Sequence, residues 1–134
     1  MQDRQSGAQA NTWGRETARR IAEKLGATGM RRASNECVLN GQRAVIKCAG
    51  PKTRSVGVTY KMIERIDVVV AAFAGEHATF QLFVLSPEEF KKAMRETRSR
   101  GASAGKVGLV ERRVFEQLGK DIGRVQVDRR PNSR

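Results

Sequence analysis

Glu36 and Lys47 are the two side chains whose types and spacing best suggest chemistry. They stand on either side of Asn40-Gly41, and Asn-Gly between two strand-like runs predicts a two-residue hairpin with a type I′ turn. In the register that this turn sets, Glu36 faces Val45, and Glu36 and Lys47 are diagonal neighbours on one face of the sheet. A carboxylate beside an ammonium group either forms a cross-strand ion pair or belongs to a catalytic site, and the residues alone leave both interpretations open.

The two faces of this hairpin differ in composition. The face that we expect to be core carries Cys37, Leu39, Ala44, Ile46 and Cys48. The mixed face carries Ser34, Glu36, Val38, Arg43, Val45 and Lys47. We therefore expect Val45 to lie on a non-core face, where the fold would tolerate a carboxylate in its place.

Apolar periodicity and turn signals predict the elements that position this hairpin. A disordered arm is expected over 1–12, then a helix from 13 that ends at Gly26. Further along the chain we expect strands at 34–39, 42–48, 56–58, 67–73 and 79–85, a helical turn at 60–66 and helices at 87–98 and 109–118. Ser86-Pro87 supplies the cap and the first position of the helix at 87–98. The organisation that follows is an arm (1–12), a core (13–98) and a basic linker, helix and tail (99–134).

This order of elements resembles the PD-(D/E)XK nuclease superfamily, whose pattern has a glutamate in the first helix, an acid at the start of the hairpin and an acid-x-Lys triplet on its second strand. Glu16, Glu36 and Lys47 match three of these four positions, and Val45 stands where the triplet acid would be. The segment Arg65-Ile66-Asp67 is similar to the basic-x-Asp step that often precedes the family's buried strand. The resemblance implies an α/β, restriction-endonuclease-like fold with a central mixed sheet of about five strands flanked by helices.

The resemblance also implies a site. Members of this family hydrolyse phosphodiesters with Mg²⁺ held by carboxylates and a lysine near the attacking water, so Glu36, Lys47 and Glu16 become the candidate catalytic residues, with Glu36 and Glu16 as metal ligands. Val45 supplies no ligand from its side chain, so endonuclease activity stays open. The plainer interpretations are an ion pair for Glu36, a favourable acid in a helix's first turn for Glu16, and for Asp67 a residue that starts a strand and pairs with Arg65.

Charge indicates the partner. The chain carries 26 Lys and Arg against 14 Asp and Glu, a net charge of +12, and residues 91–134 hold 13 of the basic and 5 of the acidic residues. Such an excess favours a nucleic acid, and the resemblance to the nuclease superfamily implies DNA more than RNA. The expected contacts are Lys52, Arg54, Arg95, Arg98, Arg100 and Lys106, with Arg112 and Arg113 behind them. The alternatives are a non-enzymatic RNA- or ribosome-associated module, or a basic protein with no such partner.

Other classes are disfavoured. The sequence has no apolar run that would span a bilayer and no signal peptide at its start, so we expect a cytoplasmic protein that has no membrane partner. Cys37, Cys48 and the single His77 lack zinc-site spacing, and the cysteines are expected to be small buried hydrophobes. Trp13 and Tyr60 are either lids over the core or platforms on which bases stack. The oligomeric state is left open, a dimer included.

Overall fold

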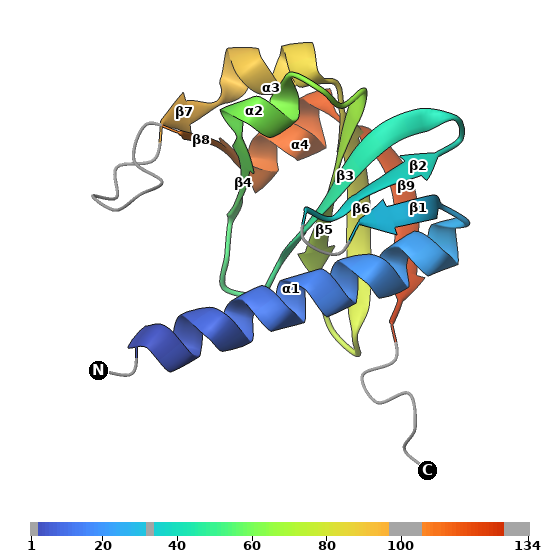
Figure 1. The fold of residues 1–134 in the computed structure, drawn as a ribbon, viewed down its shortest axis with the longest axis vertical. Helices are drawn as coiled ribbons and strands as arrows, with labels where there is room; N and C mark the ends of the chain where they lie inside the picture. The colour runs from blue at the N-terminus through green and yellow to red at the C-terminus, as the bar shows by residue number, and fades with distance from the viewer. Residues whose placement is uncertain (1–2, 32–33, 97–105, 128–134) are drawn as a thin grey trace.

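A computed structural model of the chain describes residues 3–31, 34–96 and 106–127. Two sheets and four helices make up this part of the protein (Figure 1). In chain order the elements are α1 (Asp3–Leu25), β1 (Thr28–Arg31), β2 (Glu36–Leu39), β3 (Gln42–Ala49), β4 (Ser55–Thr59), α2 (Tyr60–Ile63), β5 (Val68–Ala74), β6 (Thr79–Leu85), α3 (Pro87–Ala93), β7 (Arg95–Glu96), β8 (Val107–Glu111), α4 (Arg112–Leu118) and β9 (Lys120–Gln126).

The larger sheet has six strands in the order β1-β2-β3-β5-β6-β9. β3 and β5 pair in parallel, and the other neighbours in this sheet pair antiparallel. The smaller sheet is antiparallel, in the order β4-β8-β7. The α/β class and the mixed main sheet are thus confirmed, with six strands in place of about five.

The hairpin of β2 and β3 has the predicted register. Leu39 faces Gln42, and Glu36 faces Val45. Asn40 and Gly41 both have positive φ, 53° and 78°, which a type I′ turn requires and which these two residue types adopt at little cost.

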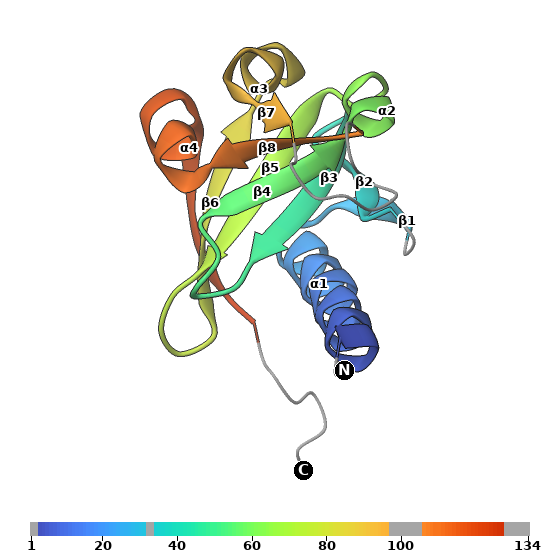
Figure 2. The ribbon, with the colours of Figure 1, turned by 90° about the vertical axis from the view of Figure 1, so that its left-hand side faces the viewer.

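Helix α1 covers one face of the main sheet (Figure 2). Three residues on one side of the helix, Ala18, Ile21 and Ala22, are buried against the sheet residues Ile46 and Leu82. Ile21 and Ala22 follow Ala18 by three and four residues, which is the spacing of one helical turn. This helix-side core contains the hairpin face that was predicted to be core.

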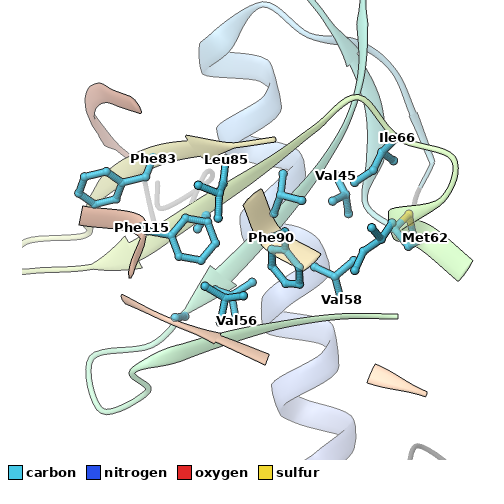
Figure 3. Close-up of a cluster of buried hydrophobic side chains, with 14 of the residues drawn as sticks. Val45, Val56, Val58, Met62, Ile66, Phe83, Leu85, Phe90 and Phe115 are labelled. Atoms are coloured by element: carbon cyan, nitrogen blue, oxygen red, sulfur yellow. The ribbon is translucent and has the colours of Figure 1, made fainter. Parts of the chain in front are cut away.

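The opposite face of the main sheet is covered as well. The smaller sheet and the short helices α2, α3 and α4 lie over it and enclose a second apolar core (Figures 2 and 3). Phe115 of α4 lies at its centre, with its ring 5.8 Å from that of Phe73 and 6.3 Å from that of Phe90. The Arg112 guanidinium lies 5.1 Å from the centre of the Phe73 ring.

The prediction that Val45 lies on a non-core face is wrong. Its exposed fraction is 0%, and it belongs to the second core together with Val58, Met62 and Ile66 (Figure 3). The hairpin pattern showed polar neighbours on this face and gave no sign of the layer above it, because that layer is built from segments far away in the sequence.

Residues 106–127 are part of the fold, although a linker, a helix and a tail are expected over 99–134. The predicted helix at 109–118 is present only as α4, and β8 before it pairs with β4. β9 adds an edge strand to the main sheet by pairing with β6. The strand is rich in charged residues, and its register against β6 shifts between Leu82 and Phe83, so Ile122 and Val125, three residues apart, both pack against the helix-side core without a simple alternation. Residues 128–134 lie outside the described residues.

The start of the chain differs from the expectation of a disordered arm over 1–12. Helix α1 starts at Asp3, so residues 3–12, expected as disordered, are helical. No proline interrupts 3–25, and the small and polar residues of this segment extend the helix that the core-facing turns nucleate.

The helix expected at 87–98 stops at Ala93, while its predicted cap is confirmed: the Ser86 hydroxyl accepts a hydrogen bond from the Glu89 N–H, at 3.1 Å.

Candidate functional site

Glu36 stands at the first position of β2, and its carboxylate is fully engaged. Arg65 donates from Nε to Oε2 at 2.8 Å and from Nη2 to Oε1 at 3.1 Å, and the Ser34 hydroxyl donates to Oε1 at 2.8 Å. The Glu36 side chain is 15% exposed and that of Arg65 is 46% exposed. Both carboxylate oxygens are therefore occupied by donors of the chain itself.

The electrostatics of Glu36 follow from this contact. The hydrogen bond from Arg65 lowers the pKa of the Glu36 carboxyl to about 2, with smaller lowering contributions from Ser34 and from the charges of Arg65 and Arg31, while burial acts in the opposite direction. Glu36 is an anion at neutral pH, and it is neutralised by a guanidinium.

Lys47 lies on the same face of the main sheet as Glu36, on β3 beside Ala71 of β5. It is half-buried, and this burial lowers the pKa of its ammonium group. Its position relative to Glu36 is the predicted diagonal one, but no carboxylate of the described residues forms an ion pair with it. The partner of Glu36 is Arg65, a residue that the sequence analysis had noted only as a neighbour of Asp67.

Asp67 has a structural contact. Its Oδ2 accepts a hydrogen bond from the Arg43 N–H at 2.8 Å, and its own N–H donates to the Arg43 carbonyl at 2.7 Å. These bonds fix the start of β5 to β3, which supports the interpretation of Asp67 as the residue that starts the buried strand. The expected partner Arg65 bonds Glu36 instead.

The two candidate metal ligands are not brought together. Glu16 lies on α1, which covers one face of the main sheet, whereas Glu36 points to the other face, on the side of Val45. Across the described ranges there is no group of three or more His, Cys, Asp or Glu side chains that could hold a metal ion. With Glu36 bonded by Arg65 and Val45 buried in apolar surroundings, the residues present do not fit a Mg²⁺ site.

A groove lies elsewhere, at the carboxyl ends of the parallel strands β3 and β5. This carboxyl-end groove has a volume of about 770 Å³. It is lined by Trp13, Glu16, Thr17 and Arg20 of α1, by Pro51 after β3, by Ala74, Gly75, His77, Ala78 and Phe80 around the β5–β6 turn, and by Gln126 and Val127 at the end of β9. Crevices at the carboxyl ends of parallel strands are where open α/β sheets commonly bind ligands.

Trp13 forms an aromatic wall of the groove. Its side chain packs against Phe80 at a ring-centre distance of 6.2 Å, with the rings tilted by 38°, and it remains 41% exposed. Both interpretations from the sequence remain open, because the contact with Phe80 fits a lid over the helix-side core and the exposed part of the indole fits a stacking platform. Arg20 and Glu16 place one positive and one negative group in the same lining.

The turn between β5 and β6 forms another wall, and it is strained. His77 and Ala78 both have positive φ, 58° and 56°, and the Thr79 N–H donates to the Glu76 carbonyl at 3.1 Å. Alanine is not a type that favours this region in the way that glycine or asparagine does, so the strain lies at Ala78. The end of β9 holds the turn in place: Gln126 Nε2 donates to the His77 carbonyl at 3.0 Å, and the Val127 N–H donates to the Ala78 carbonyl at 2.9 Å.

The predicted basic contacts fall into two separate places. Lys52 and Arg54 are exposed in the loop that also contributes Pro51 to the groove. Lys106 lies at the opposite end of the smaller sheet, where its carbonyl accepts from the Tyr60 N–H at 2.9 Å, and Arg95 lies on the edge strand β7. Arg98 and Arg100 lie outside the described residues.

Arg112 and Arg113, expected behind these contacts, have acidic partners. Arg112 Nε pairs with Glu116 Oε2 and Arg113 Nε with Glu111 Oε1, each at 3.0 Å. Their positive charge is partly compensated, so they are weaker candidates for contacts to phosphate than Lys52 and Arg54, which none of the ion pairs among the described residues includes.

Trp13 and the basic loop are visible in the sequence, but the groove itself is not. Its lining comes from α1, the 50–54 loop, the β5–β6 turn and the end of β9, and no local pattern relates these segments. The one available signal was Trp13 itself, near the start of the predicted helix.

No protein-family model matches the chain, and no curated protein matches its sequence. Among the helices of the described residues, none combines the length and apolar character needed to cross a membrane.

Cys37 is buried and Cys48 half-buried, and burial raises the pKa of both thiols, that of Cys48 to about 12.

Proposed function

We propose that this protein binds DNA through its basic surface, on a restriction-endonuclease-like scaffold whose metal centre is not formed. The observation that carries this proposal is the net charge of +12 on 134 residues, combined with exposed cations beside a groove. The net charge already counts every Asp and Glu against the Lys and Arg residues, so it measures the positive excess that is left for a polyanion.

The topology supports the scaffold. After α1, the strands β1, β2 and β3 form an antiparallel unit, and the chain then passes through β4 and α2 before β5 joins β3 in parallel. This arrangement is compatible with the resemblance to the nuclease superfamily, in which a hairpin precedes a buried central strand. Fold alone does not give function, so the activity has to be argued from the site.

The site supports binding over cleavage. The position of the missing triplet acid is occupied by Val45, which is fully buried, and the remaining hairpin acid is held by Arg65. A metal-dependent phosphodiesterase needs carboxylate oxygens free to coordinate the ion. The arrangement around Glu36 instead ties β2 to the segment that follows α2.

Two measurements test this function. Fluorescence anisotropy of a labelled mixed-sequence duplex should show binding at about 50 mM salt that weakens steeply by about 200 mM, because lysine and arginine contacts release counterions. A plasmid incubated with the protein and Mg²⁺ or Mn²⁺ should remain intact. Absence of binding at the lower salt concentration would refute DNA binding, and metal-dependent cutting would restore the enzymatic interpretation.

The RNA-binding alternative is decided by the same assay. A structured RNA of equal length that binds more tightly than the duplex at matched salt would replace DNA by RNA as the partner. Equal or weaker binding of the RNA supports the proposal as stated.

A further inference from the structure

The carboxyl-end groove is distinct from the Glu36 region. Its lining residues Ala74, Phe80 and Val127 belong to or adjoin the helix-side core, whereas Glu36 lies on the opposite face of the main sheet. A ligand in the groove would therefore be bound without any contribution from the hairpin acid or Lys47.

The lining of the groove has the composition of a site for a flat aromatic ligand. Trp13 presents an exposed indole supported from behind by Phe80, and a tryptophan that is held in place in this way stacks on a base with little loss of side-chain freedom. Glu16 supplies a carboxylate that can accept hydrogen bonds from base N–H groups, and Arg20 adds one positive group to the same lining.

The cations for the phosphates lie at the rim. Pro51 lines the groove, and the exposed side chains of Lys52 and Arg54 follow it in the same loop. The loop is anchored, because the Arg54 carbonyl accepts a hydrogen bond from the Arg112 N–H at 2.7 Å. A nucleotide strand would match this arrangement with a base directed into the groove towards Trp13 and its phosphates directed to Lys52 and Arg54.

The opposite rim is rigid. The strained His77–Ala78 turn is fixed by hydrogen bonds from Gln126 and Val127, so the groove has its shape before any ligand binds. Strained non-glycine backbone persists where the surrounding structure holds it, and such positions are concentrated at ligand sites.

We propose that the carboxyl-end groove binds unpaired nucleotides of DNA, with a base stacked on Trp13 and the adjoining phosphates held by Lys52 and Arg54. This inference rests on the proposed function and specifies its substrate as DNA with a single-stranded stretch. A base inside a duplex cannot reach Trp13, because both of its faces are covered by its neighbours in the stack.

The sequence provides a direct reporter, because Trp13 is the single tryptophan of the chain. Titration with a short oligothymidylate should change the Trp13 fluorescence, while an abasic strand with the same number of phosphates should bind more weakly and leave the emission nearly unchanged. A fluorescence response that is the same with both strands would mean that only phosphates are recognised, and it would overturn the stacking role.

Variants separate stacking from folding. Trp13→Leu keeps an apolar side chain but removes the aromatic face, so the affinity for labelled oligothymidylate should fall about tenfold or more, whereas Trp13→Phe should stay within about threefold of the parent. Leu118→Ala, at a 55% exposed apolar position on α4 outside the groove, is the matched control and should not alter binding. Unchanged binding by a folded Trp13→Leu variant would refute the inference.

Failure of this inference and failure of the proposed function give different results. If the groove inference alone is wrong, the protein still binds labelled duplex in a salt-dependent way, and single strands produce no tryptophan response. If the proposed function is wrong, neither duplex nor single strand binds at low salt.

Discussion

Arg65 reaches from the segment after α2 to Glu36 at the start of β2 and donates two hydrogen bonds to its carboxylate, at 2.8 Å and 3.1 Å. The two residues are 29 positions apart in the sequence, so the pair joins the hairpin to the connection that leads into the central strand β5. An acid that the sequence suggested as a metal ligand is thus a structural anion.

The first prediction is a pH-dependent loss of stability in Glu36→Gln. The folded pKa of Glu36, about 2, lies below its ordinary value of 4.5, so the charge of Glu36 stabilises the fold above pH 4.5, and this stabilisation disappears as the pH falls towards 2. The variant should be less stable than the parent by about 1 kcal/mol at pH 7, a figure reduced for the solvent exposure of the ion pair. The difference, measured by urea unfolding, should shrink between pH 4.5 and pH 2.

Glu23→Gln provides the control, because Glu23 is exposed on α1 and lies in none of the ion pairs among the described residues. Its stability difference from the parent should stay small at both pH values. A Glu36→Gln variant with a constant deficit over this range would show that the Arg65 contact does not depend on the charge of Glu36.

Local signals predicted the parts of the fold that short segments determine. Asn40-Gly41 alone defines a turn type, and the turn type defines which residues face one another, so the Glu36–Val45 pairing followed without knowledge of the rest of the chain. The strand at 79–85 and the cap at Ser86 are local for the same reason: alternation and a side-chain hydrogen bond lie within a few residues.

The burial of Val45 could not be obtained in this way. Its neighbours Arg43 and Lys47 on the same face are polar, and the layer that buries Val45 comes from β4, α2 and the C-terminal segment. The alternation of a strand shows which residues share a face, but it does not show what covers that face. A few polar residues at the edge of a buried face are enough to make the whole face look solvent-exposed in the sequence.

The candidate site likewise has one part that local sequence predicts and one part that it does not. The diagonal relation of Glu36 and Lys47 was predictable because it depends on register, whereas the Arg65 contact depends on how the connection after α2 folds back over the sheet. The groove depends on four segments that meet at one end of the sheet, so the sequence showed only Trp13 and the loop cations as separate features.

The second prediction corrects the expectation that a carboxylate at position 45 would be tolerated. Val45→Glu places an ionisable group in the second core, where the exposed fraction is 0%, and should cost about 3 kcal/mol or more, or prevent folding. Val45→Ala, the control, removes only apolar contacts and should cost about 2 kcal/mol. Urea unfolding with and without Mg²⁺ measures both, and a folded Val45→Glu protein that Mg²⁺ stabilises would show that a metal site can be completed there.

The third prediction concerns the turn at the groove. Ala78→Gly should stabilise the protein by about 0.5 kcal/mol, because relief of the left-handed backbone, worth about 1–2 kcal/mol, exceeds the extra entropy of glycine in the unfolded chain. Ala93→Gly, at the last residue of α3, is the control and should destabilise the protein by about 1 kcal/mol, because glycine has more freedom in the unfolded chain and the Ala93 methyl group packs against the second core. Thermal unfolding of the two variants should therefore move in opposite directions, and a lower melting temperature for Ala78→Gly would show that the turn is not strained.

The last prediction assigns phosphate contacts to the loop after β3. If Lys52 and Arg54 each neutralise a phosphate, the double variant Lys52→Ala/Arg54→Ala should bind DNA more weakly, and the slope of log affinity against log salt should decrease in magnitude by about 2. Both side chains are exposed, so the fold should be unaffected and the thermal unfolding midpoint should match that of the parent.

Lys120→Ala is the matched control, because Lys120 is an exposed cation at the first residue of β9, whereas the groove is lined from the other end of that strand. Its removal lowers the net charge by one without touching the groove, and its slope should stay within experimental error of the parent. Equal effects of the loop and control substitutions per charge removed would mean that the DNA responds to the total charge of +12 and not to a defined contact surface at the groove.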